Sequence, residues 1–202
     1  MSRSPVLEHK GLPVLTFADQ AAWDAWLEAQ GGRSSGLWVK FAKPSAGVPS
    51  VTKTQAIEMA LRHGWIDGQL DRFDADWWLT RFTPRGPRSN WSQINRTTAE
   101  RLIAEGQMTP AGQAQVESAK ADGRWQAAYA PQAQAEVPPD LQAALDAEPQ
   151  AKRFFETLRG SNRYAVLYRI HDAKTEKTRI ARIQKFVAML VRGETLHPPK
   201  KT

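Results

Sequence analysis

The spacing of apolar residues along the first 64 positions predicts helices that alternate with strands. Between residues 20 and 30, Trp23 and Leu27 lie four positions apart and so fall on one face of a helix, which Asp19 can cap. Residues 35–43 alternate apolar with polar side chains, the pattern of a half-buried strand. The predicted elements are a strand at 13–17, a helix at 20–30, a strand at 35–43 and a helix from Thr52 or Thr54 to His63.

The pattern then changes to two short apolar runs and a loop. Residues 65–73 and 76–82 surround a short acidic stretch and predict a hairpin or two neighbouring strands. Residues 83–90 contain two prolines and a glycine, which exclude both helix and regular strand. Further along, we predict a helix over 91–106, capped by Ser89 or Asn90, and a helix from Pro110 to about residue 123.

The apolar periodicity of the C-terminal third predicts helices, which follow an irregular stretch. Residues 124–139 are rich in Ala, Gln and Pro without periodicity, which predicts a linker on the surface. Helices are expected at 140–147, 149–158, 162–173 and 175–192. The apolar seam of the last helix comprises Ile180, Ile183, Phe186, Val187, Leu190 and Val191.

These patterns together predict an α+β chain with three parts. Residues 1–123 form an α+β domain with a small, mainly antiparallel sheet flanked by helices, in which residues 1–11 are frayed. Residues 124–139 are the linker, and residues 140–202 form a basic helical C-terminal module.

The amino-acid composition excludes several kinds of functional site. The chain of 202 residues has no cysteine, which excludes disulfides, Cys-based zinc sites and a thiol nucleophile. Its four histidines show no metal-ligand spacing, so we expect neither a metal nor a cofactor. The N-terminus lacks a secretory pattern, and no apolar run reaches 18 residues. We therefore expect a soluble, cytoplasmic protein without membrane insertion, whose oligomeric state the sequence does not fix.

The formal charge of +7 belongs to the C-terminal part. Residues 151–202 carry 13 Lys or Arg against 4 acidic residues, whereas residues 1–150 have a net charge of −2. A basic module favours nucleic acid or an acidic protein as a partner. The alternative is a solvated helix face that keeps the protein soluble. The predicted basic patch comprises Lys174, Lys177, Arg179, Arg182 and Lys185.

The segment from Gly64 to Asn95 is the best candidate site. It holds four of the eight tryptophans and four arginines, a mixture suited to an anionic, partly flat ligand. Its arginines flank a proline-stiffened loop that leads into a helix N-terminus, where backbone N–H groups also favour anions. We predict a small anionic ligand, such as a nucleotide or phosphorylated metabolite. The predicted ligand-binding residues are Trp65, Asp67, Arg81, Arg85, Ser89, Trp91, Ser92 and Asn95.

Each of these assignments has a structural alternative. Arg81 can instead pair with an aspartate at 67, 71 or 74 across the hairpin, and Trp91 or Trp78 can belong to the core rather than stack on a ligand. Asp67 is the candidate general base if the protein is an enzyme acting on an anionic substrate. The alternative, which is the commonest use of an Asp-Gly pair, is that it simply forms a turn with Gly68. Neither a serine-hydrolase elbow nor a common nucleotide-phosphate loop occurs, which favours binding over catalysis.

Several short motifs resemble one family. They are GWIDGQ, the RFTPR element followed by S-x-W-S-x-x-N, the run AEGQMTPAG, and a tail pattern from Tyr164 to Ile183. In combination they resemble the YdeI/OmpD-associated, or bacteriocin-protection-like, family from about residue 13 to 193. The resemblance implies a small bacterial protein linked to tolerance of envelope-directed antimicrobial agents, with no settled catalytic residues. The family's recurring polar positions correspond here to Asp67, Arg81, Pro84, Arg85, Ser89, Trp91, Ser92 and Asn95.

Overall fold

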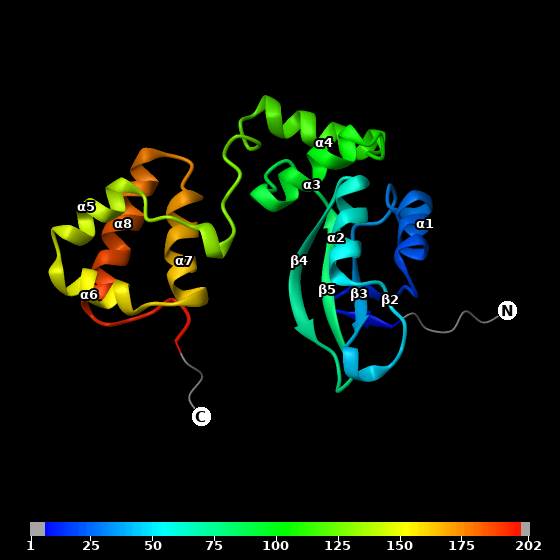
Figure 1. The fold of residues 1–202 in the computed structure, drawn as a ribbon, viewed down its shortest axis with the longest axis horizontal. Coiled ribbons are helices and arrows are strands. Elements are labelled where there is room, and N and C mark those ends of the chain that lie inside the picture. The colour runs from blue at the N-terminus through cyan, green and yellow to red at the C-terminus, as the bar shows by residue number, and fades with distance from the viewer. Residues whose placement is uncertain (1–6, 199–202) are drawn as a thin grey trace. The chain divides into compact units, whose positions relative to one another are not determined.

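The computed structural model describes residues 7–198, and its contacts divide the chain into two units. Unit 1 ends at Ala128, and unit 2 begins at Tyr129. Figure 1 shows the strands confined to unit 1 and a group of helices in unit 2. The fold class is therefore α+β, as the hydrophobic pattern predicted.

A five-stranded sheet organises unit 1. Its order is β1-β2-β3-β5-β4. Three of the four pairings are antiparallel, and the pairing of β2 with β3 is parallel because α1 crosses over between them. The strands are β1 (Glu8–His9), β2 (Leu12–Thr16), β3 (Leu37–Ala42), β4 (Trp65–Arg72) and β5 (Trp77–Pro84).

Helices α1 (Gln20–Gln30) and α2 (Lys53–Arg62) supply the main core of unit 1. Asp19 caps α1 as predicted, and Thr52 caps α2 through a reciprocal capping box with Gln55. Both helices lie beside the strands (Figure 1), and Trp23 of α1 is completely buried. This core combines Trp23, Leu27, Leu37, Val39, Phe41, Ala56, Trp65 and Phe82, among others.

Three local predictions in unit 1 were wrong. Residues 8 and 9 pair with β2 instead of fraying, whereas residues 1–6 of the same prediction lie outside the described part. Asp67 and Gly68 do not form a turn, because β4 continues through them and is only bulged between Asp67 and Leu70. The N-cap of α3 (Gln93–Ala104) is Ser92 and not Ser89 or Asn90.

A second buried cluster joins α2 to the helices that follow the sheet. α3 and α4 (Pro110–Ala121) pack around Leu61, Trp91 and Val116. Trp125 and Ala128 are also buried in this cluster, so the start of the segment predicted as a surface linker packs into unit 1. Trp125 is held there by an edge-on contact with Trp91, whose ring centroid lies 4.8 Å away.

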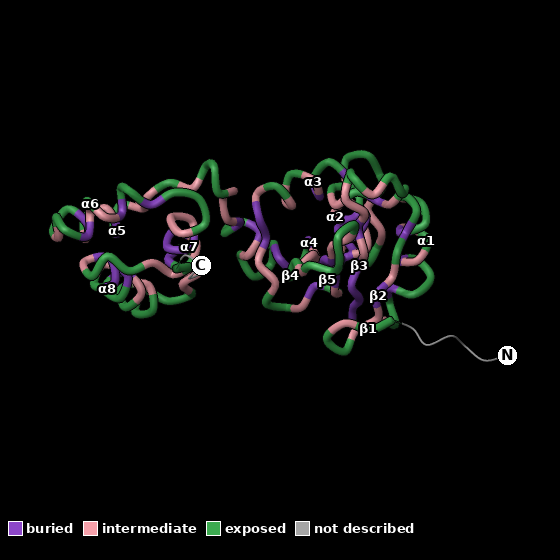
Figure 2. The backbone as a smooth tube through the Cα atoms, turned by 90° about the horizontal axis from the view of Figure 1, so that it is seen from below, coloured by how far each residue is buried: buried purple, intermediate pink, exposed green. Residues whose placement is uncertain are grey.

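Unit 2 is a small helical bundle with a core of its own. It begins with a 3-10 turn, η2 (Gln132–Gln134), and Figure 2 shows buried positions along its helices. Ile183, Phe186 and Leu190 face this core as predicted, but Ile180 is 49% exposed and does not belong to the seam. The helices are α5 (Pro139–Asp146), α6 (Pro149–Thr157), α7 (Gly160–His171) and α8 (Glu176–Val191).

Candidate functional site

The loop between β5 and α3 uses its arginine and tryptophan for packing. Arg85 is only 5% exposed, and its guanidinium carbon lies 3.7 Å from the centre of the Trp91 ring. Its Nη1 donates to the carbonyl oxygen of Asn90 at 3.2 Å, and its backbone N–H donates to Gly64. The guanidinium is therefore mostly covered by Trp91 and by the loop that it supports.

The other predicted residues of this loop also have local roles. Ser89 Oγ accepts the backbone N–H of Gly86, and the Ser89 carbonyl accepts a hydrogen bond from Arg124 at 3.0 Å. Ser92 Oγ accepts the backbone N–H of Asn95 at 3.1 Å and so caps α3. The structure therefore brings Arg85, Ser89 and Trp91 together, but as a scaffold.

Arg81 and Asp67 lie elsewhere. Arg81 is exposed on β5, where its side chain extends over Gly68 of β4. Asp67 is half-buried and lies 3.7 Å from the Lys53 ammonium. If Asp67 were the general base of an enzyme, its carboxylate would be buried beside the arginines. It is instead half-buried and lies near the ammonium of Lys53.

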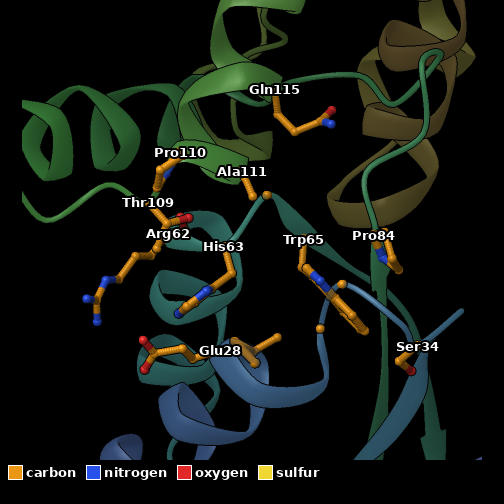
Figure 3. Close-up of a pocket in the computed structure, with 14 residues that line it drawn as sticks. Glu28, Ser34, Arg62, His63, Trp65, Pro84, Thr109, Pro110, Ala111 and Gln115 are labelled. Atoms are coloured by element: carbon orange, nitrogen blue, oxygen red, sulfur yellow. The ribbon is translucent and has the colours of Figure 1, made fainter.

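A cavity of about 600 Å³ lies next to the predicted segment, where the ends of α1 and α2 meet the start of α4 (Figure 3). Trp65 and Pro84 line it, so of the eight predicted ligand-binding residues only Trp65 belongs to it. Its volume is within the range of sites that hold small molecules. The lining side chains that carry polar atoms are Glu28, Ser34, Arg62, His63, Trp65, Thr109 and Gln115.

Two glycines allow α4 to close one side of this cavity. A Cβ at Gly112 would lie 2.2 Å from the Arg62 carbonyl oxygen, and a Cβ at Gly64 would lie 2.9 Å from the Ala111 carbonyl oxygen. Gly64 also adopts a φ of +75°, which side chains rarely tolerate. Thr109 completes the contact by donating its hydroxyl to the Arg62 carbonyl at 2.7 Å. The backbone of α2 thus meets α4 without intervening side chains.

Arg62 and His63, which line the cavity, share one carboxylate partner, Asp24 of α1. His63 Nε2 lies 2.7 Å from one oxygen of Asp24, and Arg62 Nη1 lies 2.5 Å from the other. The His63 side chain is only 10% exposed, and its Nδ1 has no hydrogen-bond partner within residues 7–198. Since the carboxylate can only accept, Asp24 fixes the ring and leaves Nδ1 for a ligand.

Three features of this wall were not evident from the sequence. Asp24 and His63 are far apart in the sequence, so no local pattern connects them. His63 appeared only as the end of a predicted helix, and no motif singled out Gln115. A weak indication was available, because a histidine before the helix-ending Gly64 can fold back beside the preceding helix. What could not be predicted is the approach of α1 and α4.

A second cavity of about 650 Å³ lies at the other end of α2. Trp78 lines it and stacks on Phe41 with ring centroids 4.7 Å apart. Its lysines are already engaged, because Lys43 donates to two carbonyls of the β4–β5 turn and Lys53 lies near Asp67. We therefore place the candidate site in the first cavity, whose lining includes His63, with one ring nitrogen that has no hydrogen-bond partner within residues 7–198.

The predicted basic patch of unit 2 is partly neutralised. Arg179 makes a two-pronged ion pair with Asp140 at 2.5 and 2.8 Å, and its guanidinium lowers the pKa of that carboxyl. Arg182 and Lys174 lie 3.8 and 3.3 Å from Asp172. Lys177 and Lys185 are exposed on α8 and have no ion pair within residues 7–198. Three of the five cations thus have an acidic neighbour, and only Arg179 makes a close two-pronged pair.

Two broader features concern residues 7–198 as a whole. They contain no group of three or more histidines and carboxylates placed to hold a metal ion. No helix in this part of the chain has the length and apolarity needed to cross a membrane.

Comparison with known families separates the two units. Residues 15–115, half of the chain, match a domain of unknown function, DUF8412. Residues 134–193 match the family described as bacteriocin-protection, YdeI or OmpD-associated, which confirms the resemblance in the tail. Neither a curated protein nor a solved structure matches the chain. The chain therefore belongs to the DUF8412 family through unit 1 and carries a YdeI or OmpD-associated, bacteriocin-protection domain in unit 2.

Proposed function

We propose that unit 1 binds a small, flat, polar molecule in the cavity between α1, α2 and α4. The observation that carries this proposal is His63, whose ring is nine-tenths buried in the cavity wall while Nδ1 has no partner within residues 7–198. A ring nitrogen of a mostly buried side chain that makes no hydrogen bond within the protein is available to bind a ligand. The Trp65 indole, which also lines the cavity, offers an apolar surface and an N–H donor.

The wall also limits the charge of the ligand. Arg62 is already paired with Asp24, and the carboxylate of Glu28 lies at the exposed side of the cavity. A nucleotide or another multiply charged phosphate would meet the carboxylate of Glu28 and a single permanent cation, Arg62, whose charge is already paired. The charges of the wall therefore favour a small polar ligand over the multiply charged anion expected from the sequence.

The physiological role is proposed from the family of unit 2. Its match to bacteriocin-protection proteins supports a part in tolerance of antimicrobial agents. We propose that the protein acts in the cytoplasm and that ligand binding in unit 1 serves this tolerance. Cell fractionation, with a deletion strain tested for sensitivity to envelope-directed agents, checks both statements. Normal tolerance in that strain contradicts the role without affecting the binding proposal.

The binding proposal is tested by filling the cavity. Ala111 lies at its rim on α4 and is exposed, so Ala111→Trp blocks the space without disturbing the core. Ala114, exposed on the same helix and outside the cavity, provides the matched control Ala114→Trp. In a thermal-shift screen of small aromatic acids, amides and amines, a ligand at a hundredfold its Kd stabilises the protein by about 2.7 kcal/mol. We expect Ala111→Trp alone to abolish that shift. A shift that survives in Ala111→Trp places the ligand elsewhere.

A further inference from the structure

All three tyrosines of the chain line one small cavity in unit 2. Tyr164 and Tyr168 lie four positions apart on α7 and so share one face of that helix. Tyr129 comes from the segment before η2, and the centroid of its ring lies 4.9 Å from that of Tyr168. Aromatic rings from two parts of unit 2 thus converge on one space of about 110 Å³. The other residues that line it are Ala130, Ala135, Glu136, Leu167 and His171.

The three rings form walls of different orientation. The ring planes of Tyr129 and Tyr168 are nearly perpendicular, at 86°. The ring of Tyr164 is tilted by 37° from that of Tyr168, with 5.9 Å between the centroids. The Tyr164 hydroxyl donates to the Ala130 carbonyl at 3.1 Å, which ties the segment that carries Tyr129 to α7. Because rings at right angles adjoin as a corner, a group inside the cavity contacts more than one of them.

The lining of this cavity contains a carboxylate and neither lysine nor arginine, although unit 2 as a whole is basic. Glu136 is exposed and makes no ion pair within residues 7–198. Burial raises the pKa of the Tyr164 hydroxyl, so this phenol stays neutral at physiological pH. His171 is the one lining side chain that can gain a positive charge. The cavity therefore offers ring faces and one negative charge to whatever occupies it.

We infer that this cavity binds the quaternary ammonium group of a choline-like small molecule. The faces of aromatic rings are negative, and cages of such rings hold quaternary ammonium groups by cation–π attraction. Sites for whole drug-sized molecules measure roughly 300–1,000 Å³, so this smaller space suits a terminal group of a few heavy atoms. A quaternary ammonium has no N–H to satisfy, so ring faces and the Glu136 carboxylate are sufficient partners. A neutral group of the same shape gains only the apolar contact. The inference is independent of the cavity in unit 1.

Three probes of similar size test the inference on the full chain. Choline carries the quaternary ammonium, 3,3-dimethylbutan-1-ol has the same shape with carbon in place of the charged nitrogen, and ethanolamine carries a simple ammonium. Isotopic labelling of the tyrosine rings makes their NMR signals report this cavity alone, because every tyrosine of the chain lines it. Titrations at pH 8 and constant ionic strength keep imidazole groups neutral. We expect choline to shift these signals and to bind at least about tenfold more tightly than either other probe. Equal affinity for choline and the alcohol, equal affinity for choline and ethanolamine, or no shift with choline overturns the inference.

Two substitutions connect the binding to particular side chains. Tyr168→Leu removes the ring that contacts both others but keeps an apolar side chain, so choline affinity should fall at least about fivefold while affinity for the alcohol stays the same. Tyr168→Phe keeps the ring and should bind choline within about twofold of the wild type.

Glu136→Gln removes the carboxylate and should weaken choline binding about two- to fivefold. Glu156→Gln is the matched control, because Glu156 is exposed on α6 and does not line the cavity. Circular dichroism shows whether each variant is folded. Unchanged choline affinity in folded Tyr168→Leu protein, or an equal loss for choline and the alcohol, overturns the inference. If Tyr168→Leu does not fold, Glu136→Gln decides, and choline affinity equal to that of Glu156→Gln overturns the inference.

Discussion

The loop of residues 83–92 and the cavity wall around His63 lie in the same unit and use their charged side chains in opposite ways. In the loop, Arg85 is buried over Trp91 and hydrogen-bonded to the loop itself. In the wall, Asp24 holds His63 by one ring nitrogen and leaves the other without a partner in the described chain. A concentration of arginine and tryptophan thus marks where the fold is braced, and the adjacent cavity provides the open hydrogen-bonding group.

Substitution of Trp91 has the largest expected effect among the tests of this contrast. Its ring is 2% exposed and contacts both Arg85 and Trp125, so Trp91→Ala removes the centre of a buried cluster. We expect a loss of about 3–5 kcal/mol in the free energy of unfolding, measured by urea denaturation. Glu28→Ala at the cavity should change it by less than about 0.5 kcal/mol. Similar losses of unfolding free energy in the two variants would show that the Trp91 cluster and the cavity contribute equally to stability, and would contradict the contrast.

Gly112 tests whether the closure of α4 on α2 forms the cavity. The added methyl group of Gly112→Ala would lie 2.2 Å from the Arg62 carbonyl, so α4 must shift, at a cost of about 1–3 kcal/mol. We expect that variant also to lose its thermal shift with any ligand of the cavity. Gly32→Ala is the matched control, because Gly32 lines the same cavity and its Cβ would meet no atom within 4 Å. Ligand response retained in Gly112→Ala would contradict this role of α4.

Arg85 and Arg81 allow a buried and an exposed arginine of the predicted site to be compared. Both were expected to bind an anion, but Arg85 is buried and Arg81 is exposed. Arg85→Met removes the hydrogen bond to the Asn90 carbonyl and the packing on Trp91, and should cost about 1–3 kcal/mol of stability. Arg81→Met should change stability by less than about 0.5 kcal/mol. Equal effects of the two substitutions in urea denaturation would show that burial does not separate their roles.

The sequence predicted most of the elements because their local signals agree with the fold. Asp19 and Thr52 are caps in both the prediction and the structure, and the prolines and glycines mark the helix ends. The parallel pairing of β2 with β3 was missed, although the predicted strand, helix and strand between residues 13 and 43 are the order that a parallel crossover requires. The bulge after Asp67 was also missed, because an Asp-Gly pair more often signals a turn.

The candidate site was less accessible to sequence analysis, for a physical reason. Arg85 looked like a ligand-binding fork because sequence does not show that Trp91 and the loop backbone enclose it. Trp65 was selected correctly as a residue beside a cavity, but Asp24 and His63 are 39 positions apart and meet only when α1 packs beside α2. Convergence of distant polar residues depends on helix packing, which the one-dimensional pattern leaves undetermined.

Asp71 gives the smallest expected effect and a third use of charge, an exposed ion pair. Lys10 Nζ lies 2.6 Å and His9 Nε2 lies 3.0 Å from its carboxylate, and together they lower the pKa of Asp71 from 3.8 to about 2. A carboxyl with a lowered pKa in the folded state stabilises the protein fully above its unfolded value, and the contribution disappears as pH falls through about 2. Asp71→Asn should therefore be slightly less stable than the wild type near pH 6, with a difference that shrinks between pH 4 and pH 2. Urea denaturation across that range measures it, with Asp76→Asn as the control, because no ion pair involves Asp76 within the described chain. A difference that grows toward low pH would show that Asp71 is not stabilised by its cationic neighbours.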